Sequence, residues 1–186
     1  YFKETIRLAE ETGNSEYLYK CYNNLGVTYK SIGDYSAALE NFKTNMSLVR
    51  ASNNPDRLST GLINIGLVLF QMERFQEALE YDYQALNLLK GTDNFMHLAG
   101  LYNNFGLLFT ELEQYDSAYY YYEQALEIQK EIKDKPGIFR TMLGFGLIYS
   151  KQEEYDLAQN YYNKTLELAM EMDNNLFKSN GFYSMG

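Results

Sequence analysis

The feature that most constrains this chain is a glycine that recurs at a fixed spacing of 40 residues. The five copies are Gly26, Gly66, Gly106, Gly146 and Gly186. A fixed period of this length is typical of a solenoid, in which one structural unit cannot bury its apolar face alone and packs on the next copy. The period therefore predicts one repeat array over residues 1–186, with a core that neighbouring repeats share.

Further columns at the same offset predict two helices in each repeat. Large apolar residues stand three positions after the glycine, aromatic residues nine positions after it, and alanines twelve positions after it. These columns are Tyr29, Leu69, Phe109 and Tyr149; Tyr35, Phe75, Tyr115 and Tyr155; and Ala38, Ala78, Ala118 and Ala158. Apolar residues before and after the polar break at Gly33 and Asp34 fall at helical spacing. We expect an all-α fold of antiparallel helix pairs, with the second helix beginning near the Tyr35 column.

The connectors between the pairs set the expected boundaries. They are rich in Asn, Asp and Gly, and they contain both prolines, which we expect outside the helices. The expected repeats are 14–53, 54–93, 94–133 and 134–173, preceded by the second helix of another repeat at 1–13 and followed by a truncated first helix at 174–186. Because the chain begins inside a repeat and without Met, we interpret it as part of a longer polypeptide.

The glycine column predicts a close approach between helices. Glycine inside a helix costs about 1 kcal/mol relative to alanine, so its presence in every copy implies that a side chain there would collide with the adjoining helix of the pair. The alanine column at Ala38 supports the same close packing.

Composition argues against several classes of function. The net charge of −9 is spread over interleaved acidic and basic residues, which disfavours a nucleic-acid surface. No apolar run is long enough to predict membrane insertion by this segment. One histidine, His97, and one cysteine, Cys21, give no pattern for a metal site or for a catalytic centre, so we expect no cofactor, no metal and no enzymatic activity. The single cysteine leaves the cellular compartment open.

The columns resemble the tetratricopeptide repeat (TPR) family, in the roughly 40-residue variety with an Asn-Leu-Gly core that kinesin light chains and bacterial signalling regulators contain. The resemblance rests on an aromatic or Leu four positions before the glycine, on Leu25-Gly26 and on the Ala38 column. It covers the whole chain and implies a right-handed superhelix, an α-solenoid. Four residues depart from the pattern: Asp82 replaces an aromatic, Asn45 and Thr165 replace Ala, and Gly144 replaces Asn.

In that family the concave groove is lined by the first helix of each pair, which implies a set of peptide-binding residues in this chain. They are Lys20, Asn23, Asn24, Val27, Asn64, Leu67, Asn103, Asn104, Leu107 and Arg140. A side-chain amide has a donor and an acceptor to match each peptide unit, so a ladder of asparagines can hold an extended peptide. The alternative is that these asparagines bond within the solenoid and stabilise packing between repeats.

The charged positions of the groove limit which chemical groups of a ligand we expect it to bind. Lys20, Asn24 and Asn64 resemble part of the clamp by which chaperone-adaptor repeats hold a C-terminal carboxylate, but Gly100 and Asn104 stand where that clamp needs cations. We therefore do not expect chaperone-tail binding. Arg140, with no acidic neighbour at the same groove position, is a candidate anchor for an acidic group of the ligand.

Two hypotheses of function follow. The first is a non-catalytic scaffold that binds a protein or peptide segment in the groove, as part of a larger bacterial signalling or regulatory protein. The second is a structural spacer or oligomerisation module without a groove ligand. Apolar residues at the ends of the array, such as Phe2, Ile6 and Leu8, favour end-to-end self-association under the second hypothesis.

Overall fold

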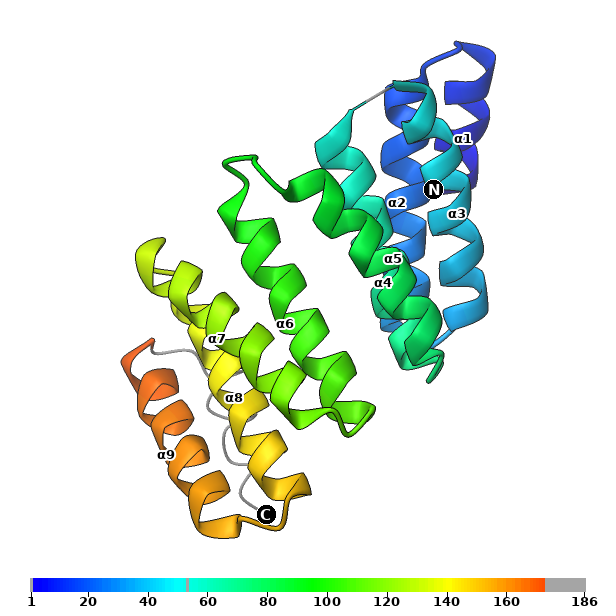
Figure 1. The fold of residues 1–186 in the computed structure, drawn as a ribbon. Helices are drawn as coiled ribbons and strands as arrows, with labels where there is room; N and C mark the ends of the chain where they lie inside the picture. The colour runs from blue at the N-terminus through cyan, green and yellow to red at the C-terminus, as the bar shows by residue number, and fades with distance from the viewer. Residues whose placement is uncertain (1, 53, 173–186) are drawn as a thin grey trace. The chain divides into compact units, whose positions relative to one another are not determined.

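The computed structural model describes residues 2–52 and 54–172, and within these ranges it contains nine α-helices and no strand (Figure 1). They are α1 (Phe2–Glu11), α2 (Ser15–Ser31), α3 (Tyr35–Ser52), α4 (Pro55–Gln71), α5 (Phe75–Leu89), α6 (Phe95–Glu111), α7 (Tyr115–Glu131), α8 (Lys135–Lys151) and α9 (Tyr155–Glu171). The even-numbered helices begin 40 residues apart, and so do the odd-numbered helices from α3 onward. The all-α solenoid of helix pairs is confirmed, and so is the expected start of the second helix. The expected helix at 174–186 lies outside the described residues.

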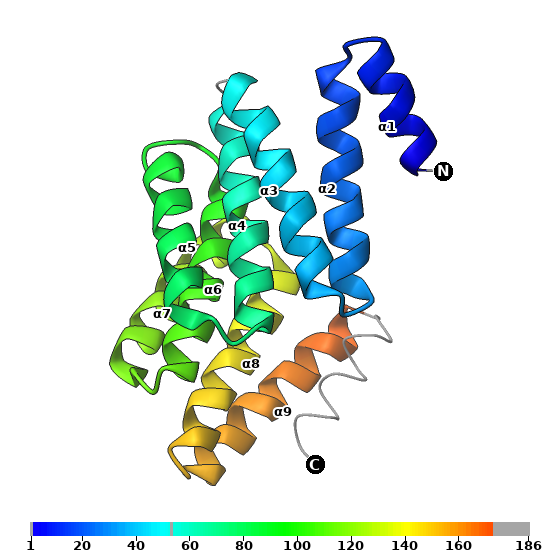
Figure 2. The ribbon, with the colours of Figure 1, turned by 90° about the vertical axis from the view of Figure 1, so that its right-hand side faces the viewer.

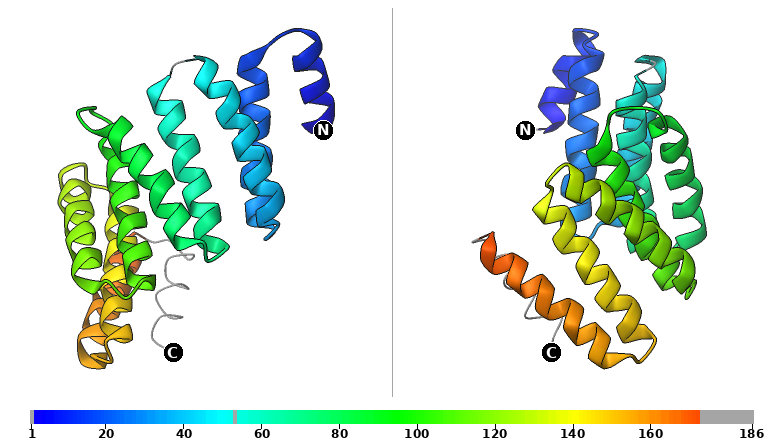
Figure 3. Two further views of the ribbon diagram at one scale, coloured as in Figure 1. Left: turned by 45° about the vertical axis from the view of Figure 1, so that its right-hand side comes forward. Right: turned by 60° about the vertical axis from the view of Figure 1, so that its left-hand side comes forward.

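The chain divides into two compact units after Gly91. In unit 1, each helix from α1 to α5 packs on the next. In unit 2, α6 to α9 also pack in sequence, and α6 contacts α8 directly. Neighbouring helices of each unit run in opposite directions (Figures 2 and 3). None of the described helices is long and apolar enough to cross a membrane.

The first helix of every pair begins with the same cap. The side chains of Asn14, Asn54, Asn94 and Asp134 each accept a hydrogen bond from the backbone N–H three residues later. These residues stand 40 positions apart, so the connectors repeat as faithfully as the helices do. Each cap satisfies one of the backbone donors that a helix start leaves without an intrahelical partner.

The prolines correct one expectation. They were expected in the connectors, yet Pro55 is the first residue of α4 and Pro136 is the second residue of α8. The first turn of a helix has no intrahelical partner for its N–H groups, so the missing donor of proline costs nothing there.

The two helices of a pair are joined by three residues, and the middle one has a left-handed backbone conformation. Gly33 has φ of 81°, and Glu73, Glu113 and Glu153 have φ of 58°, 59° and 63° at the equivalent position. The next residue returns a backbone hydrogen bond to the helix that ends, as from Asp34 to Tyr29 at 3.0 Å. Glycine adopts this conformation without a Cβ clash, so the three glutamates carry a strain that Gly33 avoids.

The recurring glycines lie where the two helices of a pair approach most closely. A Cβ built on Gly26 would be 2.6 Å from the ring of Phe42, and one built on Gly106 would be 2.6 Å from the ring of Tyr122. A Cβ built on Gly66 would meet the carboxyl of Asp82, and one built on Gly146 would meet the ring of Tyr162. The close approach that the sequence predicted is confirmed in all four described copies, and the side chain sixteen positions after each glycine fills the space.

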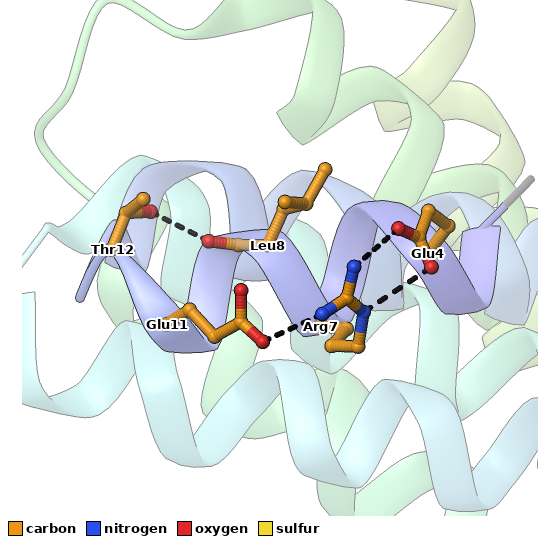
Figure 4. Close-up of polar contacts among 5 residues, drawn as sticks. All are labelled: Glu4, Arg7, Leu8, Glu11 and Thr12. Carbon is orange, nitrogen blue, oxygen red and sulfur yellow. Dashed lines mark hydrogen bonds and ion pairs between the residues drawn. The ribbon is translucent and has the colours of Figure 1, made fainter.

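Figure 4 shows the polar contacts around Arg7 on α1. The guanidinium of Arg7 lies between two carboxylates, 2.6 Å from Glu4 and 2.7 Å from Glu11. Leu8 stands beside these ion pairs with 49% of its surface exposed, and its carbonyl accepts a hydrogen bond from Thr12 at 2.8 Å.

Candidate peptide-binding surface

The structure places the ten residues implied by the family resemblance on the first helices of the pairs, in two groups. The unit 1 surface consists of Lys20, Asn23, Asn24 and Val27 on α2, with Asn64 and Leu67 on α4. The unit 2 surface consists of Asn103, Asn104 and Leu107 on α6, with Arg140 on α8. Each group is described by itself below.

In unit 1, an amide pair joins α2 to α4. The side-chain N–H of Asn64 donates to the side-chain oxygen of Asn23 at 3.2 Å. The pair leaves the amide nitrogen of Asn23 and the amide oxygen of Asn64 with no hydrogen bond to another described residue. An unused donor group and an unused acceptor group are what a single peptide unit requires of its partner.

Around this pair, the unit 1 surface combines a free amide with apolar groups. Asn24 is exposed, and its side chain makes no hydrogen bond within the described part of the chain. Val27 is 43% exposed, and Leu67 is half-buried. The surface can therefore offer hydrogen bonds to a backbone and apolar contacts to the side chains of the same ligand.

At its charged end, the unit 1 surface includes residues that the sequence argument missed. Arg57 of α4 lies 2.5 Å from Glu16 of α2, and its guanidinium stands 4.8 Å from the ring centre of Tyr19. Glu16 also lies 3.3 Å from Lys20, and the hydrogen bond from Arg57 lowers the pKa of the Glu16 carboxyl. The signal that could have found this pair is the offset of 41 residues between opposite charges, close to the repeat period. The pairing with Glu16 compensates part of the positive charge of Lys20.

In unit 2, the equivalent amide takes part in the packing of the fold. The hydroxyl of Thr141 on α8 lies 2.7 Å from the side-chain oxygen of Asn103 and 2.7 Å from the side-chain oxygen of Gln129 on α7. A hydroxyl has one proton, so the two oxygens share it. The amide nitrogen of Asn103 is buried without a partner among the described residues. Asn103 thus joins α6 to α8. This agrees with the alternative interpretation, in which the asparagines stabilise packing between repeats.

The remaining residues of the unit 2 surface are more accessible to a ligand than Asn103 is. Asn104 is half-buried and makes no side-chain hydrogen bond with the described residues, and Leu107 is half-buried nearby on the same helix. The guanidinium of Arg140 lies 3.9 Å from Asp134, the cap of its own helix. The sequence argument gave Arg140 no acidic neighbour in the groove, and the chain supplies one from the connector. The Arg140 side chain is still 55% exposed and can reach a ligand.

The loss of an asparagine at Gly144 has a structural cause. The ring of Tyr122 on α7 packs against Gly106 of α6 and also against Gly144 of α8. A Cβ at position 144 would come within 2.5 Å of the ring and 2.7 Å of the hydroxyl oxygen. An asparagine would therefore displace Tyr122, so this repeat has packing where the earlier repeats have an amide.

The run of four tyrosines at 119–122 distributes its rings around α7. Tyr122 is buried, and Tyr120 is 56% exposed. The hydroxyl of Tyr119 lies 2.5 Å from that of Tyr149 and 3.4 Å from that of Tyr161, which connects α7 to α8 and α9. Burial and these hydrogen bonds raise the pKa of Tyr119. The run is therefore mainly packing.

In the described part of the chain, no group of three or more His, Cys, Asp and Glu side chains is placed to hold a metal ion. Cys21 is a free, buried thiol on α2. His97 lies in the first turn of α6, where its ring nitrogen is 2.9 Å from the amide nitrogen of Asn94. The histidine thus contributes to the start of a helix.

Comparison with known families identifies the repeat. The model of the tetratricopeptide repeat family matches residues 22–91 and 97–171. No curated protein matches the chain in sequence.

Three solved structures illustrate the shared fold. BtubC (BKLC) from P. vanneervenii is 18% identical over 99% of this chain and 77% of its own, with a TM-score of 0.79. The Rap conjugation gene regulator of plasmid pLS20, in complex with the Phr* peptide, is 17% identical over 90% of this chain and 46% of its own, with a TM-score of 0.78. The apo form of the quorum sensor NprR from B. thuringiensis is 19% identical over 99% of this chain and 51% of its own, with a TM-score of 0.80. The chain spans about half the length of the two regulators, and at these identities the likeness shows the fold alone.

Proposed function

This chain belongs to the tetratricopeptide repeat family, and from that premise we propose that it is a non-catalytic scaffold that binds a peptide or an extended protein segment. The family is built of stacked helix pairs that present a continuous surface to partners. The surface for a ligand is on α2 and α4 in unit 1, and on α6 and α8 in unit 2.

The Asn23–Asn64 pair is the observation that carries this proposal. It holds two amides in a fixed relation across two repeats and leaves one donor and one acceptor unused. Each hydrogen bond to a peptide backbone contributes about 0.5–1.5 kcal/mol, so a few of them hold a peptide only weakly and independently of its sequence. Contacts with Val27 and Leu67 would add affinity and select apolar side chains of the ligand.

The unit 2 surface adds a preference for charge. Arg140 carries a guanidinium that is more than half exposed, and its nearest carboxylate is 3.9 Å away, longer than a direct hydrogen bond. A carboxylate of the ligand can bind this guanidinium in a bidentate manner that Asp134 does not achieve. Asn104 and Leu107 would place backbone and apolar contacts beside it.

Two similar structures supply the biological context of the proposal. The pLS20 regulator was solved with its Phr* peptide, and NprR is a quorum sensor. By analogy, this chain would be part of a bacterial regulator whose activity depends on a bound peptide or protein segment.

A random library of twelve-residue peptides tests the proposal. Peptides selected on the wild-type chain would be titrated against the double variant Asn64→Ala/Asn104→Ala. Loss of two hydrogen bonds predicts a weakening of about 5-fold to about 150-fold, corresponding to about 1–3 kcal/mol.

The matched control is Asn87→Ala/Asn160→Ala, because these two asparagines are exposed on the second helices α5 and α9, one in each unit. The control should bind the selected peptides as the wild type does. Equal binding by all three proteins, with unchanged melting temperatures, would show that the asparagine surface is not the binding site.

Self-association is the second candidate function, and the exposed Leu8 on α1 is the observation that favours it. An exposed apolar side chain of this kind can dock on an apolar patch of another copy. Light scattering over a range of concentrations would reveal a mass that increases with concentration and that Leu8→Glu returns to the monomer. A monomeric mass for the wild type at every concentration would exclude this candidate.

A further inference from the structure

The column of side chains that face the recurring glycines has one member of different chemistry. Phe42, Tyr122 and Tyr162 place an aromatic ring against Gly26, Gly106 and Gly146. Asp82 places a carboxyl against Gly66 in the pair formed by α4 and α5. Among the four described helix pairs, one thus has a carboxyl group at the centre of the packing in place of an aromatic ring.

This carboxyl is isolated from water and from hydrogen-bond donors. Asp82 is 1% exposed, and both of its oxygens are buried without a partner among the described residues. On α5, the residues one turn before and after it are Ala78, Leu79, Ala85 and Leu86, all of them buried. On α4, the residues around Gly66 are apolar as well, among them Leu62, Ile65 and Leu69.

No charged group compensates this carboxyl within the described part of α4 and α5. The ionisable residues of α4 are Asp56 and Arg57, both in its first turn, and Arg57 pairs with Glu16. At 1.5 Å per residue, the nine positions from Arg57 to Gly66 correspond to roughly 13 Å along the helix.

The ionisable residues of α5 point elsewhere. Glu77 pairs with Arg74 at 2.6 Å, and Glu80 is exposed. Tyr83 is 42% exposed, and Tyr81 is half-buried. None of these groups offers a cation to Asp82.

We propose that Asp82 makes the docking of α5 on α4 dependent on protonation, so that the neutral carboxyl keeps α5 in place and the charged carboxyl releases it. The physical reason is that a buried charge without a partner costs far more free energy than a buried neutral carboxyl. Because α5 is the last helix of unit 1, followed by Lys90 and by Gly91 with φ of 79°, it can open without disturbing the middle of the unit. The device would act independently of any ligand on the first helices.

The direction of the pH dependence follows from linkage. Burial raises the pKa of Asp82 well above its ordinary value. The docked helix therefore holds the proton more tightly than the released helix, in which the pKa is about 3.9. Between these two pKa values the docked state loses stability as the pH rises, by a factor of about ten in the opening equilibrium per pH unit. Above the raised pKa the loss is complete and constant.

Hydrogen–deuterium exchange of the full chain from about pH 4.5 to about pH 8, corrected for the intrinsic exchange rate, measures this opening directly. In the wild type, protection of the α5 amides should fall about tenfold per pH unit within the titration window, whereas protection of α7 should not follow this course. Asp82→Asn removes the charge and keeps the shape, so its α5 protection should lose this dependence. Glu80→Gln is the matched control on the same helix and should behave as the wild type does.

A second variant keeps the test decisive if Asp82→Asn does not fold. Asp82→Phe restores the ring that Phe42 places against Gly26, so α5 should be better protected than in the wild type at every pH. If α5 protection in the wild type has the same pH dependence as in Asp82→Asn or Asp82→Phe, the proposal is wrong. It is equally wrong if α5 and α7 lose protection in parallel as the pH rises.

Discussion

The α4–α5 pair of unit 1 and the α6–α7 pair of unit 2 have the same geometry and opposite chemistry at their centres. Gly66 faces the unpaired carboxyl of Asp82, and Gly106 faces the ring of Tyr122. Tyr122 also packs against Gly144 and Phe145, so its ring joins α6, α7 and α8. The difference teaches that the repeat tolerates a polar centre where a helix lies at the edge of a unit, and that an aromatic ring occupies the position where three helices meet.

The same difference extends to the surfaces of the two units. In unit 1, the amides of Asn23 and Asn64 bond to each other and retain unused groups. In unit 2, Asn103 bonds to Thr141, and Gly144 has replaced the next amide to make room for Tyr122. In unit 2, the contacts that Asn103 and Tyr122 make between helices are therefore accompanied by fewer polar groups for a ligand.

The largest expected effect on stability comes from placing in unit 2 the carboxyl that unit 1 has opposite its glycine. Tyr122→Asp removes a ring from a fully packed site and introduces a buried carboxyl, so the free energy of unfolding should fall by at least the ~3–5 kcal/mol typical of deleting a buried aromatic side chain. Urea unfolding followed by circular dichroism would measure the change. Tyr120→Asp, two residues earlier and 56% exposed, is the control and should change stability little. Similar losses for both variants would mean that the Tyr122 ring has no special role.

A smaller effect is expected from closing the gap that the glycine provides. Gly106→Leu would force a side chain into the ring of Tyr122, and overpacking of this kind costs about 1–3 kcal/mol. Differential scanning calorimetry should show a clearly lower melting temperature. An unchanged melting temperature would contradict the packing role of the glycine column.

The smallest effect belongs to the matched glycine on the same helix. Gly100 has no atom within 4 Å of the position that a Cβ would occupy. Gly100→Ala should therefore stabilise the chain by about 0.5–1 kcal/mol through helix propensity alone. A destabilisation as large as that of Gly106→Leu would show that both glycines are under the same packing constraint. The distinction between the open position of Gly100 and the packed position of Gly106 would then be wrong.

Much of the fold could be predicted from the sequence because the same local sequence signals recur in each repeat. The caps at Asn14, Asn54, Asn94 and Asp134, the aromatic column at Tyr35 and the glycine column each recur with the same spacing. The placement of Pro55 and Pro136 outside the helices was wrong by one or two residues, because the same sequence signals mark the end of a connector and the start of a helix.

The candidate surface was less predictable. The sequence indicated which residues stand on the first helices, but partners such as Arg57 for Glu16 and Thr141 for Asn103 depend on side-chain reach between successive repeats. Hydrogen bonds and ion pairs of this kind require distances of about 3 Å, which a repeat period alone does not specify. The groove residues thus remain a prediction that the peptide titration can test.

The sequence by itself determined the helix pairs, their boundaries to within a few residues, and the close approach at each recurring glycine, because these follow from periodicity and backbone sterics. It also showed that Asp82 and Gly144 depart from the repeat. Only the tertiary structure decided what the departures mean: Gly144 makes room for the ring of Tyr122, and Asp82 is buried without a partner among the residues that the structure describes. The physical reason is that the effect of a side chain depends on the atoms around it, and those atoms come from other helices.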